Sequence, residues 1–237
     1  MTYRSPSEPS SIAQELAARL GLAFRDWSLL ETALTHSSYL NEDSRGKLES
    51  NERLEFLGDA VIGLVIAQEL YDRCPDAGEG DLTNRRTHVV RGSSLAQVAR
   101  GLGLGGYLRM GRGEDAAGGR ERESNLEDAL EALVGAVFLD GGYDAARVLA
   151  LRILKELIDE IVRHGIPQNA KGRLQELTQG RSLGQPRYEL VETSGPDHAP
   201  TFTVAVEVNG KVLGRGTGNS KLDAEQAAAR EALEKLS

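Results

Sequence analysis

Cysteine, aromatic residues and long hydrophobic runs are scarce in this sequence of 237 residues. The single cysteine, Cys74, cannot form an internal disulfide, which fits a reducing compartment, and it leaves no set of thiolates for a zinc or iron–sulfur site. The longest apolar stretch, residues 60–67, is too short to span a bilayer, and residues 1–11 contain no apolar block of the kind that signal peptides carry. We therefore expect a cytoplasmic protein without a membrane partner, which begins with a disordered tail over residues 1–11.

Acidic residues outnumber basic ones, 36 against 28, and give the chain a net charge of -8. A chain-wide average of this sign argues against a nucleic-acid partner. The excess is not evenly spread, however, because residues 169–237 contain nine basic and nine acidic residues, whereas residues 1–168 contain 19 basic and 27 acidic ones. The average therefore describes only the first part of the chain, and it does not exclude a nucleic acid as a partner.

The spacing of apolar residues divides the chain into two domains. Over residues 12–162 the spacing is mostly helical and predicts an all-helical domain. Residues 163–170 (RHGIPQNA) lack periodicity and are typical of an exposed linker. Residues 171–237 predict a helix, three strands and a second helix, with Asn209-Gly210 as a hairpin turn. The expected strands cover residues 188–192, 202–208 and 212–216.

Carboxylates interrupt two strongly apolar helical segments, residues 51–67 and 125–140. In the first segment Glu52, Glu55 and Asp59 stand at positions i, i+3 and i+7, and therefore share one helix face. In the second, Asp128 and Glu131 stand at i and i+3. Burying carboxylates among apolar residues is costly unless a positive group meets them. The pattern therefore indicates a site at which something neutralises the acids.

Two such helices, packed together, can bring four carboxylates to one point: Glu55, Asp59, Asp128 and Glu131. Oxygen ligands without cysteine or histidine favour Mg²⁺ or Mn²⁺ over zinc. A di-iron centre would need Glu-x-x-His pairs, which the four histidines do not supply. The alternative is that the acids are surface charges, paired with Arg53 or with Arg85 and Arg86. Gly58 and Gly63, inside the first segment, indicate a close helix approach or access for a ligand.

In the second domain, alternating glycines precede a helix that opens with Ser220-Lys221. The three glycines are Gly214, Gly216 and Gly218. Beside a helix N-terminus they would let backbone N–H groups face a phosphate, with Lys221 adding charge. An upstream helix with Gln175, Glu176 and Gln179, and a loop with His198, supply two further contact regions, a layout that suits double-stranded RNA. A small α+β domain with a glycine-rich turn is the alternative.

A glycine pattern at residues 101–106 (GLGLGG) matches the dinucleotide fingerprint G-x-G-x-x-G only formally. A helix end precedes it, where the fingerprint requires a strand. We therefore expect no nucleotide cofactor.

The motifs in combination resemble ribonuclease III of the bacterial type. NERLEFLGDAV (51–61) is similar to the signature of that family. LLETALTHSSY (29–39) precedes it, and EGDLTNRRTHVVR (79–91), GGRERES (118–124) and EDALEALVGAVFLD (127–140) follow in family order. Residues 169–236 resemble a double-stranded RNA-binding domain. The resemblance implies an all-α nuclease domain followed by a small α+β domain of order α-β-β-β-α.

The resemblance further implies an Mg²⁺-dependent endonuclease for double-stranded RNA that works as a homodimer, with Mn²⁺ as a substitute. Metal-activated water would attack the phosphodiester and leave 5′ phosphates, 3′ hydroxyls and short 3′ overhangs. Ribosomal RNA precursors and some messenger RNAs are the substrates expected. A protein that binds the duplex without cutting it is the alternative.

Residue roles follow from the same resemblance. Asp59 and Glu131 match catalytic acids, and together with Glu55 and Asp128 they match the metal ligands. Glu52 and Glu79 match ancillary acids of the active site, and Phe56 matches a residue of the dimer interface. The RNA-contact positions are Gln175, Glu176, Gln179, His198, Ser220 and Lys221. Three positions depart from the family pattern: Leu222 replaces a lysine, Gly172 a threonine, and Glu127 a small residue.

Overall fold

A computed structural model describes residues 10–42, 48–165, 170–195 and 200–236 of the chain. The chain separates into two compact units, residues 1–165 and 166–237. The first unit is helical and the second is a small α+β unit, which confirms the expected fold class. No helix within the described ranges is both long and apolar enough to cross a membrane.

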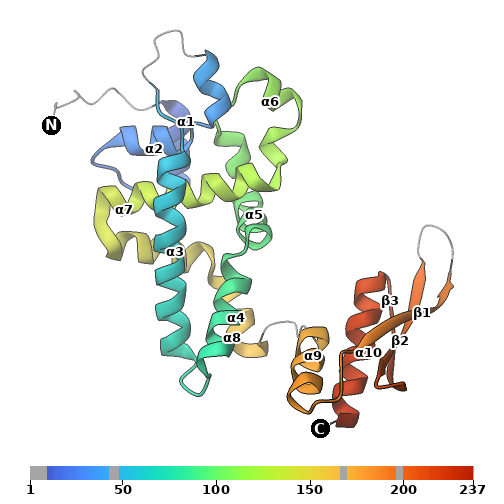
Figure 1. Cartoon of the computed structure of the whole chain (residues 1–237). Helices are drawn as coiled ribbons and strands as arrows, with labels where there is room; N and C mark the ends of the chain where they lie inside the picture. Colours follow the sequence, from blue (N-terminus) through green and yellow to red (C-terminus); the bar gives the residue numbers. More distant parts are fainter. Residues whose placement is uncertain (1–9, 43–47, 166–169, 196–199, 237) are drawn as a thin grey trace. The chain divides into compact units, whose positions relative to one another are not determined.

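The first unit consists of α-helices and short 3₁₀ helices (Figure 1). In chain order they are α1 (Ser11–Arg19), α2 (Trp27–Ala33), η1 (Ser37–Glu42), α3 (Glu52–Arg73), α4 (Glu79–Val90), α5 (Gly92–Gly101), η2 (Leu104–Tyr107), α6 (Arg112–Ala116), η3 (Gly119–Glu121), α7 (Glu123–Ile153) and α8 (Lys155–His164). The expected linker 163–170 overlaps the end of α8, and its residues 166–169 lie outside the described ranges, as does most of the expected N-terminal tail.

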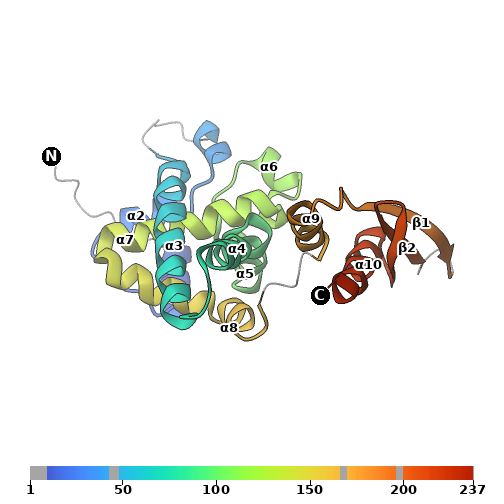
Figure 2. The same ribbon diagram turned by 60° about the horizontal axis from the view of Figure 1, so that its bottom comes forward.

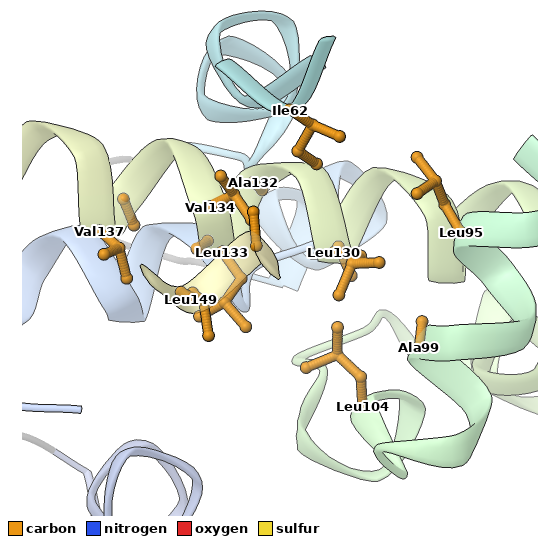
Figure 3. Packing of buried hydrophobic residues seen from close by; sticks show 14 of the residues in the cluster. Ile62, Leu95, Ala99, Leu104, Leu130, Ala132, Leu133, Val134, Val137 and Leu149 are labelled. Carbon is orange, nitrogen blue, oxygen red and sulfur yellow. The ribbon is translucent and has the colours of Figure 1, made fainter. Parts of the chain in front are cut away.

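The helical unit is built around α7, whose residues 129–137 are buried on every side. Ile62 of α3 packs on one side of it, and Leu95 and Ala99 of α5 lie on another, together with Leu104 of η2 (Figure 3). A helix that is apolar all round must be covered by others, and here α3 and α5 cover it.

Glycines bring α3 and α7 into direct backbone contact where they cross. A Cβ at Gly58 would lie 2.5 Å from the carbonyl carbon of Glu131, and a Cβ at Gly135 would lie 3.2 Å from the carbonyl carbon of Leu54. Both glycines are therefore required by the close approach of the two helices, as expected for Gly58. At Gly63, by contrast, nothing in the described structure lies within 4 Å of an added Cβ.

Helix α7 is broken at Gly142, whose φ of 80° and ψ of −173° are outside the helical region. This positive φ favours glycine because it has no Cβ. After the break, Tyr143 donates from its hydroxyl to Gln68 Oε1 at 2.7 Å, and Arg147 lies 3.4 Å from Glu69 Oε2. The second half of α7 is thereby tied to the C-terminal half of α3.

The second unit is an antiparallel sheet of order β1-β2-β3 with both helices on one side (Figure 2). Its elements are α9 (Ala170–Gly180), β1 (Arg187–Ser194), β2 (Thr201–Val208), β3 (Lys211–Gly218) and α10 (Lys221–Leu236). Asn209 and Gly210 join β2 to β3 with φ values of 51° and 75°, which suits a type I′ hairpin turn. The hairpin prediction is therefore correct.

The alternating glycines of β3 serve packing, a role that the sequence did not indicate; the expectation that they face a phosphate stays a prediction. Gly214, Gly216 and Gly218 all belong to β3 and lie against α10. A Cβ at Gly216 would lie 2.6 Å from the carbonyl carbon of Ala227, and one at Gly218 would lie 2.6 Å from the amide nitrogen of Ala224. The missing side chains let α10 approach the sheet with its alanine face.

Candidate active site

The first group of acids stands at the beginning of α3. Asn51 precedes the helix and is buried, and its N–H donates to the carbonyl of Thr35 at 2.8 Å, which fixes where α3 starts. Glu52 and Asp59 are exposed, whereas Glu55 is half-buried. Glu52 and Glu55 also lie in the first turn, where the helix dipole favours negative charge.

The second group of acids stands near the beginning of α7. Asn125 holds this end of the helix, because its side-chain amide donates to Glu114 Oε1 at 2.9 Å and to the carbonyl of Gly119 at 3.0 Å. Arg122 forms an ion pair with the same Glu114. Asp128 is half-buried and Glu131 is only 6% exposed. The support at the start of α7 therefore comes from Glu114, which sequence reasoning did not single out.

The charges of the two groups act on one another. Burial raises the pKa of Glu131 to about 8, and the negative charges of Asp59 and Glu55 add to the effect across the helix crossing. Burial likewise raises the pKa of Glu55, and the negative charges of Asp128 and Glu52 raise it further. The structure therefore brings Glu52, Glu55 and Asp59 of α3 to the same region as Asp128 and Glu131 of α7.

One histidine opposes this repulsion. Burial raises the pKa of Asp128, while the charge of His36 lowers it. The His36 ring is held by Ser38, whose Oγ lies 2.7 Å from Nδ1. Sequence reasoning found no role for His36, although it lies within the motif LLETALTHSSY.

The carboxylates lie in the same region, but their side chains are not arranged to coordinate one metal ion. Within the described ranges, no group of three or more His, Cys, Asp or Glu side chains is arranged so that it could hold a metal ion. The expected convergence on a single point is therefore not reached by the side chains in this arrangement. Mutual repulsion of like charges accounts for such a spread, and a divalent cation is the counter-charge that would reverse it.

Glu79 and Arg85 were expected near the acids, and the structure places them differently. Glu79 is the first residue of α4 and is exposed. Among the described residues, it is not one of the charges that raise the pKa of Glu55, Asp128 or Glu131. Arg85, suggested as a surface partner of the acids, instead donates to Asp81 at 2.8 Å and to the carbonyl of Ile161 at 2.6 Å.

Phe56 lies on the outer side of α3, and 80% of it is exposed. Leu64 and Tyr71, further along the same helix, are 58% and 72% exposed. The spacings of eight and seven residues between them are close to two helical turns each, so the three side chains share one face. This exposed apolar face is of the kind that marks a protein–protein interface.

The proposed RNA-contact residues of the second unit have different surroundings. Gln175, Glu176 and Gln179 are exposed along α9, and Lys221 is exposed at the first residue of α10. The Ser220 hydroxyl accepts from the N–H of Asp223 at 3.1 Å and donates to its carboxylate at 2.7 Å, so it caps α10. His198 lies outside the described residues. Leu222 is 59% exposed beside Lys221.

Comparisons with known proteins identify the family of both units. A family model described as ribonuclease-III-like matches residues 26–157, and one described as a double-stranded RNA binding motif matches residues 170–236. Ribonuclease 3 of Caldanaerobacter subterraneus is 50% identical over 221 residues, which cover 93% of this chain and 96% of the relative. Ribonuclease 3 of Desulforamulus reducens is 47% identical over 230 residues, with 97% and 94% coverage.

Solved structures give the same result for the helical unit. The ribonuclease III nuclease domain of Campylobacter jejuni, described for flexibility in a region involved in dimer formation, matches with a TM-score of 0.56. It is 40% identical, and the match covers 60% of this chain and 96% of that domain. A second structure of that nuclease domain is 39% identical, with a TM-score of 0.55 and coverage of 65% and 96%. The chain thus belongs to the ribonuclease III family, the endoribonucleases specific for double-stranded RNA.

Proposed function

We propose that this chain hydrolyses double-stranded RNA with Mg²⁺ held between α3 and α7. The ligands are Glu55 and Asp59 from α3 and Asp128 and Glu131 from α7. The observation that carries this proposal is the mutual effect of these acids across the helix crossing, where burial and the surrounding carboxylates raise the pKa of Glu131 to about 8. Such an arrangement is unfavourable for a protein alone and favourable once a divalent cation is bound.

The donor set fits magnesium. All four side chains offer carboxylate oxygens, the ligands that Mg²⁺ and Mn²⁺ prefer, and ribonucleases of this family generally use Mg²⁺. Glu131 is fixed by its burial and by the backbone contact of Gly58 with its carbonyl group. Asp59 is exposed, so it can face both the ion and the RNA. We therefore propose that Mn²⁺ substitutes for Mg²⁺.

The four carboxylates play different parts in the reaction. When bound, the metal lowers the pKa of a water molecule and neutralises charge on the scissile phosphate. Asp59 and Glu131 are the catalytic acids of the proposal, and Glu55 and Asp128 complete the ligand set. Glu52 adds negative charge beside Glu55 and Asp128 and is ancillary, and Glu79 is a more distant ancillary acid. The products are 5′ phosphates and 3′ hydroxyls.

A homodimer is part of the proposal, supported by the exposed apolar face of α3 that contains Phe56. Two sites in one dimer would cut the two strands a short distance apart and leave 3′ overhangs. The second unit supplies duplex binding through Gln175, Glu176 and Gln179 on α9 and through Lys221 at the start of α10. Ser220 and His198 are the further RNA-contact residues of the proposal. Ribosomal RNA precursors and some messenger RNAs are the proposed substrates.

The experiment that tests the proposal uses a long RNA duplex incubated with the full chain in Mg²⁺, in Mn²⁺ and in EDTA. Glu131→Ala and its near-isostere Glu131→Gln should abolish cleavage and retain the gel shift of the duplex in EDTA, because binding comes mainly from the second unit. Asp144→Ala, which removes an exposed acid from the second half of α7, is the matched control and should cut normally. Duplex that stays intact in Mg²⁺ while still shifting on a gel would refute the catalytic proposal.

A further inference from the structure

Glu127, the residue before Asp128 on α7, packs its carboxylate against Gly92, the first residue of α5. A Cβ at Gly92 would lie 2.7 Å from both Cδ and Oε1 of Glu127, and closer still to Oε2. Glu127 is half-buried in this position. The carboxylate therefore occupies the space that the missing side chain of Gly92 provides.

The carboxylate lies beside the first turn of α5, and no hydrogen bond joins the two within the described residues. Arg91 occupies the N-cap position and makes no side-chain cap hydrogen bond. The first backbone bond of the helix runs from the N–H of Ser94 to the carbonyl of Arg91 at 2.9 Å, so the N–H groups of Gly92 and Ser93 precede it. Unpaired N–H groups and the positive end of the helix dipole both favour a neighbouring carboxylate.

Glu127 adds an acid to a site that is already crowded with negative charge. Its charge contributes to the raised pKa of both Glu55 and Glu131. The pKa of Glu127 is itself raised by burial and by the charges of Asp128 and Glu123. The contact with Gly92 keeps the carboxylate beside α5. The family resemblance leads us to expect a small residue at position 127, and Gly92 provides the space that the larger side chain needs.

We propose that Glu127 is a positioning residue of the active site, which seats its carboxylate on Gly92 and so fixes α7 against α5 at the turn that carries Asp128 and Glu131. It is not one of the metal ligands. The inference rests on the proposed function, since fixing this turn matters because Asp128 and Glu131 hold the metal.

The test compares Glu127→Ala with Glu127→Gln, whose amide has nearly the same size and shape against Gly92. Loss of one side-chain contact costs about 1 kcal/mol, which corresponds to about fivefold in an equilibrium or a rate. Glu127→Ala should lower kcat for duplex cleavage about fivefold and raise the Mg²⁺ concentration for half-maximal rate by a similar factor, with KM for RNA unchanged. Glu127→Gln should restore both. Glu123→Ala, which removes an exposed acid one turn earlier on α7, should behave as the wild type.

A second measurement does not depend on cleavage. In EDTA, amide hydrogen exchange over residues 92–94 should be about fivefold faster in Glu127→Ala than in the wild type and unchanged in Glu127→Gln. Gly92→Ala should displace the carboxylate and give the same faster exchange, and combining Gly92→Ala with Glu127→Ala should add nothing further, because both changes break one contact.

Two results would overturn the inference. Equal impairment of Glu127→Gln and Glu127→Ala would mean that the charge of Glu127, not its contact with Gly92, is its role. Full additivity of Gly92→Ala and Glu127→Ala would mean that the two residues act independently. A wild-type chain that fails to cut in Mg²⁺ would refute the proposed function, and the exchange comparison in EDTA would then decide the contact by itself.

Discussion

The crossing of α3 and α7 should not tolerate a single added methyl group at Gly58. In Gly58→Ala the new Cβ would start 2.5 Å from the carbonyl carbon of Glu131, whereas carbon atoms pack at about 3.5 Å or more. The two helices must therefore separate by about 1 Å, because the obstacle is backbone and cannot rotate away. Overpacking of this kind costs about 1–3 kcal/mol or more, which outweighs the gain of about 1 kcal/mol in helix propensity.

Gly101→Ala is the matched control, because Gly101 ends α5 in a conformation without positive φ and nothing in the described structure lies within 4 Å of its added Cβ. That variant should be as stable as the wild type or more stable by up to about 1 kcal/mol. Thermal unfolding of the helical unit should separate the two variants by about 2–3 kcal/mol, or roughly 4–12 °C.

Cleavage supplies the second measurement. Gly58 lies between Glu55 and Asp59 in sequence and contacts the backbone of Glu131, so a shift of the helices displaces the ligands themselves. A displacement of about 1 Å can lower a rate by about a hundredfold, and kcat of Gly58→Ala should fall by that order. A Gly58→Ala variant as stable and as active as Gly101→Ala would refute the close helix approach as the basis of the site.

Three further predictions concern charge, assembly and the second unit. Glu131→Gln should be more stable than the wild type in EDTA at pH 8. The pKa of Glu131 is about 8 in the folded chain and 4.5 in the unfolded chain, so the free energy of unfolding of the wild type falls by a few kcal/mol as the pH rises between these values. Equal pH dependence of the two thermal transitions would contradict this prediction. Phe56→Ala should weaken the dimer at least about thirtyfold in sedimentation experiments, while Ile12→Ala, 45% exposed on α1, should not. Gly216→Ala should destabilise the second unit by about 2 kcal/mol and weaken duplex binding, while Gly180→Ala, whose Cβ would meet nothing within 4 Å, should do neither.

Periodicity and resemblance together predicted the architecture well. The helical first unit and the α-β-β-β-α second unit are both confirmed, and the turn at Asn209-Gly210 has the conformation that its sequence indicates. These features depend on local chemistry, which a sequence displays directly. The geometry of the site was less predictable from the sequence. The spacing showed that Glu55 and Asp59 share a helix face, but it did not show how near Glu131 would lie to them.

What the sequence could not show was the use of particular residues in packing. The glycines of β3 have the composition of an anion-binding loop, and only the position of α10 reveals that they admit a helix. His36 acts on Asp128, which is distant in sequence, and Glu114 acts on Asn125, 11 residues later, so no local pattern marks either residue. Glu127 likewise gained an explanation only when Gly92, 35 residues earlier in the sequence, proved to lie beside it.

The break in α7 at Gly142 has a mechanical consequence. Because the chain turns back there, one continuous segment holds α3 at two levels, by backbone contact at Gly58 and by side-chain contacts at Gln68 and Glu69. A rod held at two points cannot pivot about either one. Phe56 and Glu55 are neighbours on this doubly held helix, so a partner that displaced the outer face of α3 would also displace the acids.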